Sequence, residues 1–303
     1  MELSRFYTKN GIAVCHQQCY AAGMRQLDPT REEETLVVTE TGLSRRREIV
    51  LREHPFELAL NEILIGSTMV LPTDLEALAV GFLFARGYIE SFREVVEILI
   101  CPEGRLTVYA RVDDPTPERS EEMIITSGCG GSGRISREML QAGPGPLGEC
   151  RMDFSEIREL IRGTLQISDL SRTTHCVHAC GFASRNGIEA CCEDVGRHNA
   201  VDKVIGTLLQ NDLCPEGAMF TTGRLTSDIV LKCARIGIPI LISRTAPSSL
   251  GIDIARRTGI TLVGYARLNR LNIFHRPDRI IQTRDQKTKH KEENTDEDLS
   301  GQR

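Results

Sequence analysis

A single cysteine stands in a glycine-rich segment at residues 126–134, with the sequence TSGCGGSGR. Glycine allows backbone conformations and close approaches that other residues forbid, so a loop of this composition leaves the thiol of Cys129 open to a reaction partner. The thiolate is the reactive form, and the positive charge of Arg134 favours it by lowering the thiol pKa. The segment therefore suits a cysteine that accepts a group and passes it on, although a surface turn with an incidental cysteine fits the same pattern.

Three further segments carry arginine directly after predicted buried strands. They are residues 222–224 (TGR), 244–246 (RTA) and 267–270 (RLNR), which we call the arginine rim. The carboxyl ends of parallel strands meet at one edge of a sheet, where ligands gather. Guanidinium groups pair bidentately with phosphate oxygens, so the rim predicts an anion site. Taken alone, each of these arginines is more often a solvated surface charge.

Length and composition limit the classes of protein that remain. The 303 residues allow one large or two ordinary domains, and we expect two. A formal net charge of −5 argues against a nucleic-acid-binding protein as a whole. No apolar run reaches the roughly 18 residues of a membrane span, and residues 1–10 do not resemble a signal peptide, so we expect a cytoplasmic protein. Eleven cysteines, an odd number, indicate reduced thiols rather than a disulfide framework.

The first half of the chain predicts a small α+β domain. Thr73 and Glu76 have the spacing of a capping box for a helix that should close at Gly87. Short strands are expected at residues 36–40, 48–52 and 56–61, and a hairpin at 95–101 and 105–112. Residues 1–34 lack a clear period and predict a poorly ordered arm, while residues 113–117 predict a linker.

The second half predicts a mixed sheet with helices on both faces. Asn186-Gly187 is a strong hairpin signal between the segments 182–185 and 188–192. Helices are expected at residues 154–166, over the apolar positions 201–209 into which the run 193–203 leads, at 227–236, and from Ser248 to Gly259. Strands are expected at 218–222, 239–243 and 260–266. The later strands should be parallel through right-handed crossovers.

These elements together predict an α/β (α+β) fold in four regions. The regions are a poorly ordered arm (1–34), a small α+β domain (35–117), an α/β domain with the cysteine segment and the rim (118–276), and a disordered tail (277–303).

The run EDVGRHNAVDK at residues 193–203, together with residues 222–224, 246–250 and 262–267, resembles the FdhD family of formate dehydrogenase accessory proteins. The resemblance covers roughly residues 36–276. It implies a sulfur carrier, and hence a sulfurtransferase, that takes a persulfide from a cysteine desulfurase and transfers the sulfur to the molybdenum bis-guanine-dinucleotide cofactor of formate dehydrogenase. It also implies a homodimer and a C-terminal domain similar in fold to cytidine deaminases.

The resemblance also implies roles for particular residues. Cys129 matches the persulfide cysteine of the family, but Ser132 stands where the family usually has a second cysteine. That departure argues against a relay between two loop thiols. The implied cofactor-binding stretch is Tyr265, Ala266, Arg267, Leu268, Asn269 and Arg270, with no catalytic metal.

Three alternatives remain open. A zinc deaminase requires His-x-Glu and a later Pro-Cys-x-x-Cys, and neither pattern is present. A metal site could be built from His175, Cys176, His178 and Cys180, although the family match here is His178 alone. A chaperone that binds the cofactor without chemistry is compatible with Ser132. Asp194 and His198 either tune chemistry near the site or anchor the start of a helix, and we favour the structural interpretation.

Overall fold

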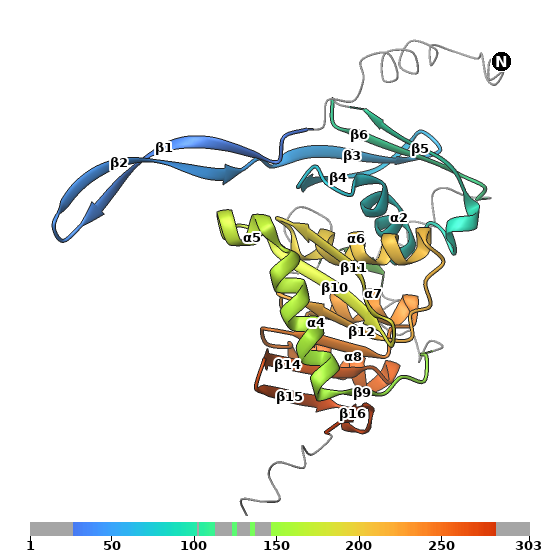
Figure 1. Ribbon diagram of the computed structural model, residues 1–303. Coiled ribbons are helices and arrows are strands. Elements are labelled where there is room, and N and C mark those ends of the chain that lie inside the picture. The colour runs from blue at the N-terminus through green and yellow to red at the C-terminus, as the bar shows by residue number, and fades with distance from the viewer. Residues whose placement is uncertain (1–26, 102, 113–122, 126–133, 137–146, 283–303) are drawn as a thin grey trace, which may run out of the picture.

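The computed structural model describes residues 27–101, 103–112, 123–125, 134–136 and 147–282. Two main sheets lie one above the other in Figure 1, with helices between them. A four-stranded sheet comes from the N-terminal half and a six-stranded sheet from the C-terminal half. The chain is therefore mixed α/β, as predicted.

The first two strands form a ribbon that projects from the rest of the chain (Figure 1). β1 (Thr30–Thr39) pairs with β2 (Gly42–Leu51) in a two-stranded sheet. Opposite charges face each other along it, with Arg47 at 3.5 Å from Glu32 and Arg45 at 4.0 Å from Glu34. Cross-strand ion pairs support strand structure in this charged sequence. The prediction that the arm extends to residue 34 is wrong for residues 30–34, and residues 1–26 lie outside the described part.

The four-stranded sheet has the order β4-β3-β6-β5. Its strands are β3 (His54–Leu60), β4 (Ile63–Val70), β5 (Val95–Cys101) and β6 (Arg105–Ala110). The predicted hairpin of β5 and β6 is confirmed, whereas β4 was not predicted. Asn61 and Glu62 turn the chain with positive φ angles of 47° and 70°. The side chain of Asn61 exchanges two hydrogen bonds with the backbone of Ala110, which secures a turn that lacks the usual glycine.

Helix α2 (Leu75–Ala85) lies under this sheet and is buried at nearly every position. The predicted capping box is wrong, because Asp74 precedes the helix in a left-handed conformation without a side-chain cap. Thr73 accepts a hydrogen bond from Lys203 at 3.2 Å instead, so its hydroxyl serves a tertiary contact. Gly87, with φ of +78°, ends the helix as predicted and donates its N–H to Phe84 O. A short 3₁₀ helix, η1 (Phe92–Glu94), follows.

The six-stranded sheet has the order β11-β10-β12-β13-β14-β15. Its strands are β10 (His178–Ser184), β11 (Gly187–Asp194), β12 (Ala218–Thr221), β13 (Ile240–Ser243), β14 (Thr261–Arg267) and β15 (Arg270–His275). The hairpin of β10 and β11 and the parallel pairing of β12, β13 and β14 confirm the predictions. β15 was not predicted, because it begins directly after the short rim turn.

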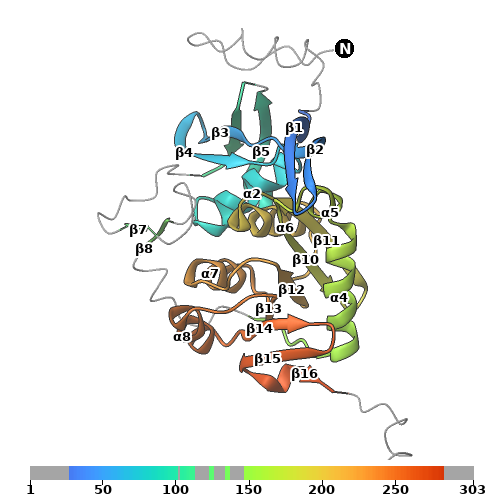
Figure 2. The ribbon, with the colours of Figure 1, turned by 90° about the vertical axis from the view of Figure 1, so that its left-hand side faces the viewer.

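Helices cover both faces of this sheet, as Figure 2 shows. α4 (Phe154–Ile167) packs on one face, where Ile157, Leu160 and Ile161 join one hydrophobic cluster. α6 (Arg197–Gln210), α7 (Ser227–Ile236) and α8 (Ser249–Thr258) pack on the other. A capping box at Asp153 starts α4, and Ser248 accepts from Gly251 N at the start of α8, as expected for Ser248.

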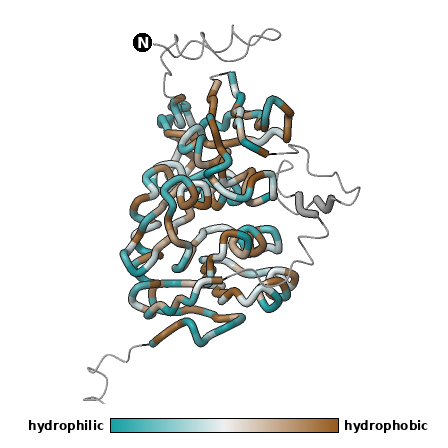
Figure 3. Tube along the Cα trace, turned by 90° about the vertical axis from the view of Figure 1, so that its right-hand side faces the viewer, coloured by the Kyte–Doolittle hydropathy of each residue, from teal (hydrophilic) through white to brown (hydrophobic). Residues whose placement is uncertain are grey.

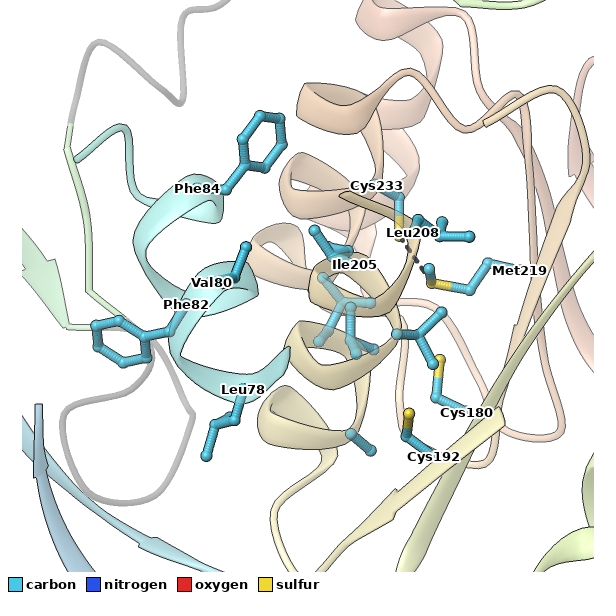
Figure 4. Close-up of a cluster of buried hydrophobic side chains, with 14 of the residues drawn as sticks. Leu78, Val80, Phe82, Phe84, Cys180, Cys192, Ile205, Leu208, Met219 and Cys233 are labelled. Atoms are coloured by element: carbon cyan, nitrogen blue, oxygen red, sulfur yellow. Dashed lines mark hydrogen bonds between the residues drawn. The ribbon is translucent and has the colours of Figure 1, made fainter. Parts of the chain in front are cut away.

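The hydrophobic core is continuous between the two sheets. Leu78 and Val80 of α2 belong to the same cluster as Ile205 and Leu208 of α6 (Figure 4). Figure 3 shows hydrophobic stretches of the chain interspersed with hydrophilic ones through the middle of the molecule. The two helices cross at glycines, since a Cβ atom on Gly206 would overlap the carbonyl oxygen of Ala77. The sheets are thus joined by direct packing of backbone on backbone.

The end of the described chain is attached to the sheet. η3 (Pro277–Arg279) and β16 (Ile280–Ile281) follow β15, and β16 pairs with β9 (Met152–Asp153). Arg279 donates to the carbonyl oxygens of Pro239 and Gly259. The prediction of a disordered tail from residue 277 is therefore wrong for residues 277–282, and residues 283–303 lie outside the described part.

Candidate functional site: an arginine rim at one edge of the sheet

Cys129 and Ser132 lie outside the described residues, but the backbone on both sides of their segment is placed. β7 (Met123–Ile125) and β8 (Arg134–Ser136) pair antiparallel, with Ile125 opposite Arg134. Ile125 and Arg134, which flank residues 126–133 in the sequence, therefore lie opposite each other in one strand pair. The role of Cys129 stays a prediction.

The rim loops are linked by hydrogen bonds that hold them in one arrangement. The carbonyl oxygen of Gly223 accepts from Ser243 Oγ at 2.6 Å and from Thr245 Oγ1 at 2.8 Å. The backbone N–H of Tyr265 donates to Thr245 O at 2.9 Å. The loops after β12 and β13 and the last residues of β14 thus support one another, which gives a ligand site the fixed backbone that it requires.

The turn between β14 and β15 carries the predicted cofactor-binding stretch. Tyr265, with φ of +49°, and Leu268 are 41% and 43% exposed, while Ala266 is fully buried. Arg267 donates from one nitrogen to Arg244 O at 2.6 Å and to Ala266 O at 2.9 Å. Arg267, Asn269 and Arg270 are exposed. The structure therefore joins the turn to the loop of Arg244, and its binding role stays a prediction.

His178 lies at the same edge, at the start of β10, because β10 runs antiparallel to β12. Its Nδ1 atom shares a hydrogen bond of 3.2 Å with Thr222 Oγ1, which also accepts from Ala179 N. Burial lowers the pKa of His178 from 6.5, and the positive charges of Arg197, His198 and Arg224 lower it further. The sequence offered His178 only as a possible metal ligand, whereas the structure makes it a neighbour of the rim.

The most distinctive run of the sequence, residues 193–203, forms a buried polar network. Asp194 accepts from Lys203 at 2.8 Å, from Leu71 N at 3.1 Å and from Gly196 N at 2.9 Å. It therefore anchors the start of α6 and ties it to the four-stranded sheet, which confirms the structural interpretation of this residue. Lys203 also donates to the carbonyl oxygens of Leu71 and Glu193.

His198 is paired inside the same network. Its Nε2 atom bonds Asp228 in the first turn of α7, and Thr226 donates to the other oxygen of Asp228. Burial lowers the pKa of His198 from 6.5, an effect that the hydrogen bond to Asp228 opposes. This histidine links α6 to α7, so its structural role is visible directly.

The residues of the alternative metal site are spread over different environments. His175 ends α5 (Asp169–Thr174) in a left-handed conformation, and Cys176 is exposed. Cys180 is fully buried, and burial raises its thiol pKa well above 9.0. Over the described ranges, no group of three or more His, Cys, Asp and Glu side chains is placed to hold a metal ion.

A cavity of about 720 Å³ lies away from the rim loops, at the base of the β1–β2 ribbon. Arg31, Arg52, His54, Met69 and Cys176 are among its lining residues. None of the predicted cofactor-binding residues lines it. In the part of the chain that the structure describes, no helix is long and apolar enough to span a membrane.

Comparison with known proteins gives one consistent result. A family model described as the FdhD/NarQ family matches residues 51–281. A protein of Chromobacterium violaceum named Sulfur carrier protein FdhD is 35% identical over 229 residues, covering 72% of this chain and 85% of that protein. A protein of the same name from Streptomyces coelicolor is 30% identical over 274 residues, covering 83% and 95%. A crystal structure of a formate dehydrogenase accessory protein from Desulfotalea psychrophila has a TM-score of 0.75 at 46% identity, covering 84% of this chain and 100% of that one.

Proposed function

Because the chain belongs to the FdhD/NarQ family, we propose that it is a sulfur carrier that serves the maturation of formate dehydrogenase. The observation that carries this proposal is the similarity to proteins named Sulfur carrier protein FdhD, which extends over 72% of the chain in one case. The glycine-flanked thiol of Cys129 supplies the chemistry that such a carrier needs.

The proposed transfer has two balanced steps. The thiolate of Cys129 attacks the outer sulfur of a persulfide on a cysteine desulfurase, the sulfur–sulfur bond of the donor breaks, and the donor cysteine leaves as a thiolate. A new sulfur–sulfur bond on Cys129 now holds the transferred sulfur. In the second step the sulfur–sulfur bond of Cys129 breaks as the sulfur passes to the molybdenum bis-guanine-dinucleotide cofactor, its substrate. A thiol reductant supplies the two electrons that bring the sulfur to the sulfide level, and Cys129 leaves as the thiolate.

The rim is the proposed binding site for this cofactor. Its three segments, residues 222–224, 244–246 and 267–270, contain four arginines and no Asp or Glu, so their charge favours the diphosphate groups of the ligand. The exposed side chains of Tyr265 and Leu268 offer apolar surface for a ring system beside that charge. These features support Tyr265, Ala266, Arg267, Leu268, Asn269 and Arg270 as the binding stretch.

The proposed partners are a cysteine desulfurase, formate dehydrogenase and a second copy of the chain. The β1–β2 ribbon supports a protein interface, because Val38 and Leu43 face each other across its outer end and are 71% and 68% exposed. We place the protein in the cytoplasm. A fold similar to the cytidine deaminases remains part of this proposal.

Mass mapping of sulfur loading tests the carrier. Incubation with a cysteine desulfurase and cysteine should add one sulfur atom to Cys129, and Cys129→Ala should abolish the addition. Cys176→Ala is the control, because Cys176 is an exposed thiol outside the cysteine segment. Ser132→Ala should keep most of the transfer, since one thiol is enough to hold a persulfide.

Equal labelling of Cys129→Ala and the parent would contradict the assignment. A cofactor-binding chaperone without sulfur chemistry is the second candidate, and Ser132 in place of a second loop cysteine favours it. It predicts no labelling of the parent, together with normal nucleotide binding.

A further inference from the structure

Hydrogen bonds between β10 and the residue that follows β12 hold His178 at the end of the rim. The hydroxyl of Thr222 bonds both His178 Nδ1 and Ala179 N, and the backbone N–H of Thr222 donates to Ala179 O at 3.0 Å. These contacts set the imidazole beside the loop that begins at Thr222. A histidine fixed in this way is oriented before any ligand arrives.

The side chain of Arg197 packs against the same loop at Gly223. A Cβ atom on Gly223 would lie 2.7 Å from Cβ and 3.1 Å from Cδ of Arg197, so the absence of a side chain at Gly223 makes room for the arginine. Arg197 is 8% exposed and begins the 14-residue helix α6. Arg224, the next residue of the loop, is exposed. Two guanidinium groups and an imidazole therefore share one short stretch of the rim.

The charges around His178 are unbalanced. Arg197 and His198 belong to α6, Arg224 to the loop after β12, and Asp194 is the opposing acid at the end of β11. Asp194 is already paired with Lys203 at 2.8 Å. Burial and these cations lower the pKa of His178, which favours the neutral imidazole when no anion is bound. An anion beside it would favour protonation.

We propose that His178, Arg197 and Arg224 form a phosphate subsite that binds the diphosphate of a guanine nucleotide and takes up a proton on His178. The subsite rests on the proposed cofactor site and extends it from the β14–β15 turn to the start of β10. Protonated histidine and arginine both donate charged hydrogen bonds to phosphate oxygens. The positive end of α6 adds to the attraction.

Calorimetry of the full chain with GDP measures this coupling. Titration at pH 7 in two buffers of different ionisation enthalpy should show proton uptake by the parent, and His178→Gln should abolish it. The terminal phosphate of GDP titrates near pH 6, so the affinity difference between parent and variant is the informative quantity. That difference should grow towards low pH and reach about tenfold at pH 6. Pyrophosphate should behave like GDP, and guanosine should show no proton uptake.

His275→Gln is the matched control. The pKa of His275 is also lowered by burial and by Arg276, but His275 lies opposite Leu262, at the other end of the sheet from the rim. Proton uptake should persist in this variant. Arg224→Gln is a second variant whose result does not depend on how well His178→Gln folds. Arg224 is exposed, so its replacement removes a cation without disturbing the core. It should raise the pKa of His178, followed by NMR, and weaken GDP binding.

Unchanged proton uptake and GDP affinity in His178→Gln would overturn the subsite, as would a failure of the parent to bind GDP. Sulfur loading of Cys129 separates this result from the proposed function. Loading without proton-coupled GDP binding overturns only the subsite. Proton-coupled binding without loading supports the subsite and overturns the sulfur carrier.

Discussion

Asp202 neutralises two buried cations from different helices. Lys232 donates to both of its carboxylate oxygens at 2.7 Å, and Arg86 to one of them at 3.3 Å. Burial lowers the pKa of Lys232 to about 8 even though Asp202 opposes this shift. Asp202 is therefore the shared partner of both cations, and the charge of the buried cluster depends on it more than on Lys232 or Arg86 alone.

This imbalance predicts unequal effects of substitution. Asp202→Asn leaves two buried cations without their acid and should lower the free energy of unfolding by about 3–5 kcal/mol. Lys232→Met should cost less, because Arg86 still pairs with Asp202. Urea denaturation measures both variants. Asp253→Asn, which removes an exposed partner of Arg256, is the control and should change stability by about 0–1 kcal/mol. Equal losses in the two buried variants would contradict this account.

Arg267 and Arg270 should both contribute to nucleotide binding, and Arg267 should also hold the turn in place. Loss of a charged hydrogen bond is worth about 1.5–3 kcal/mol, so Arg267→Ala or Arg270→Ala should weaken GDP binding by roughly tenfold to a hundredfold. Arg267 also ties the turn to Arg244 O, so its loss should disturb the loop as well. Lysine should restore binding only in part, because it lacks the planar fork.

Calorimetry at two salt concentrations checks these affinities, and sulfur loading of Cys129 should be unaffected. If both variants bind GDP like the parent, the nucleotide site lies elsewhere on the rim.

At the scale of elements, the crossing of α2 and α6 joins the two sheets. Gly81 and Gly206 permit this crossing, because a side chain at either position would overlap backbone atoms of the other helix. Gly206→Ala should therefore destabilise the protein by about 1–3 kcal/mol or more. The added methyl group would push against the backbone of α2 at Ala77, which can move only if the whole helix moves. Thermal unfolding measures the effect.

Gly163→Ala in α4 is the matched helical control for this prediction. The added methyl group would meet only the end of the Ile188 side chain, which can change rotamer. Alanine also favours helix over glycine by about 1 kcal/mol, so the control should be neutral or stabilising. Similar losses in the two variants would show that helix packing at Gly206 is not the cause.

The whole molecule should lose stability in mild acid. The pKa values of His178 and His198 are lowered from 6.5 in the folded state, mainly by burial. The unfolded chain therefore binds more protons than the folded chain as pH falls below about 6.5, and the free energy of unfolding decreases until pH passes the lowered pKa values. Urea denaturation at about pH 7.5 and pH 5.5 should show this loss. A double variant with both histidines replaced by Gln should show a smaller dependence, and an unchanged slope would contradict the prediction.

The sequence by itself determined most elements of the larger sheet. The period of apolar residues predicted α4 and α6, and start and stop residues such as Ser248, Gly237 and Gly259 predicted α7 and α8. Asn186-Gly187 predicted the turn of the β10–β11 hairpin. These signals are local. The period of a helix is visible within a few residues, and the preference for a hairpin turn depends on the two residues of the turn. The run at residues 193–203, together with residues 222–224, 246–250 and 262–267, was sufficient to indicate the family, and the match over residues 51–281 shows it.

Only the tertiary structure decided what these residues contact. Asp194 and Leu71 are hydrogen-bonded although 123 positions separate them, and His178 reaches Thr222 across 44 positions. No local pattern specifies such partners, since they depend on which strands become neighbours in a sheet and on which helices cross. The same reason explains the wrong capping box at Thr73, whose hydroxyl is bonded to Lys203. β4 was missed for a local reason, because its turn at Asn61 and Glu62 lacks the glycine that signals a hairpin. A side chain such as Thr73 can hydrogen-bond either its own helix or a distant element, and tertiary packing decides which. A buried donor without a hydrogen-bond partner costs free energy, so the arrangement that satisfies such donors is favoured.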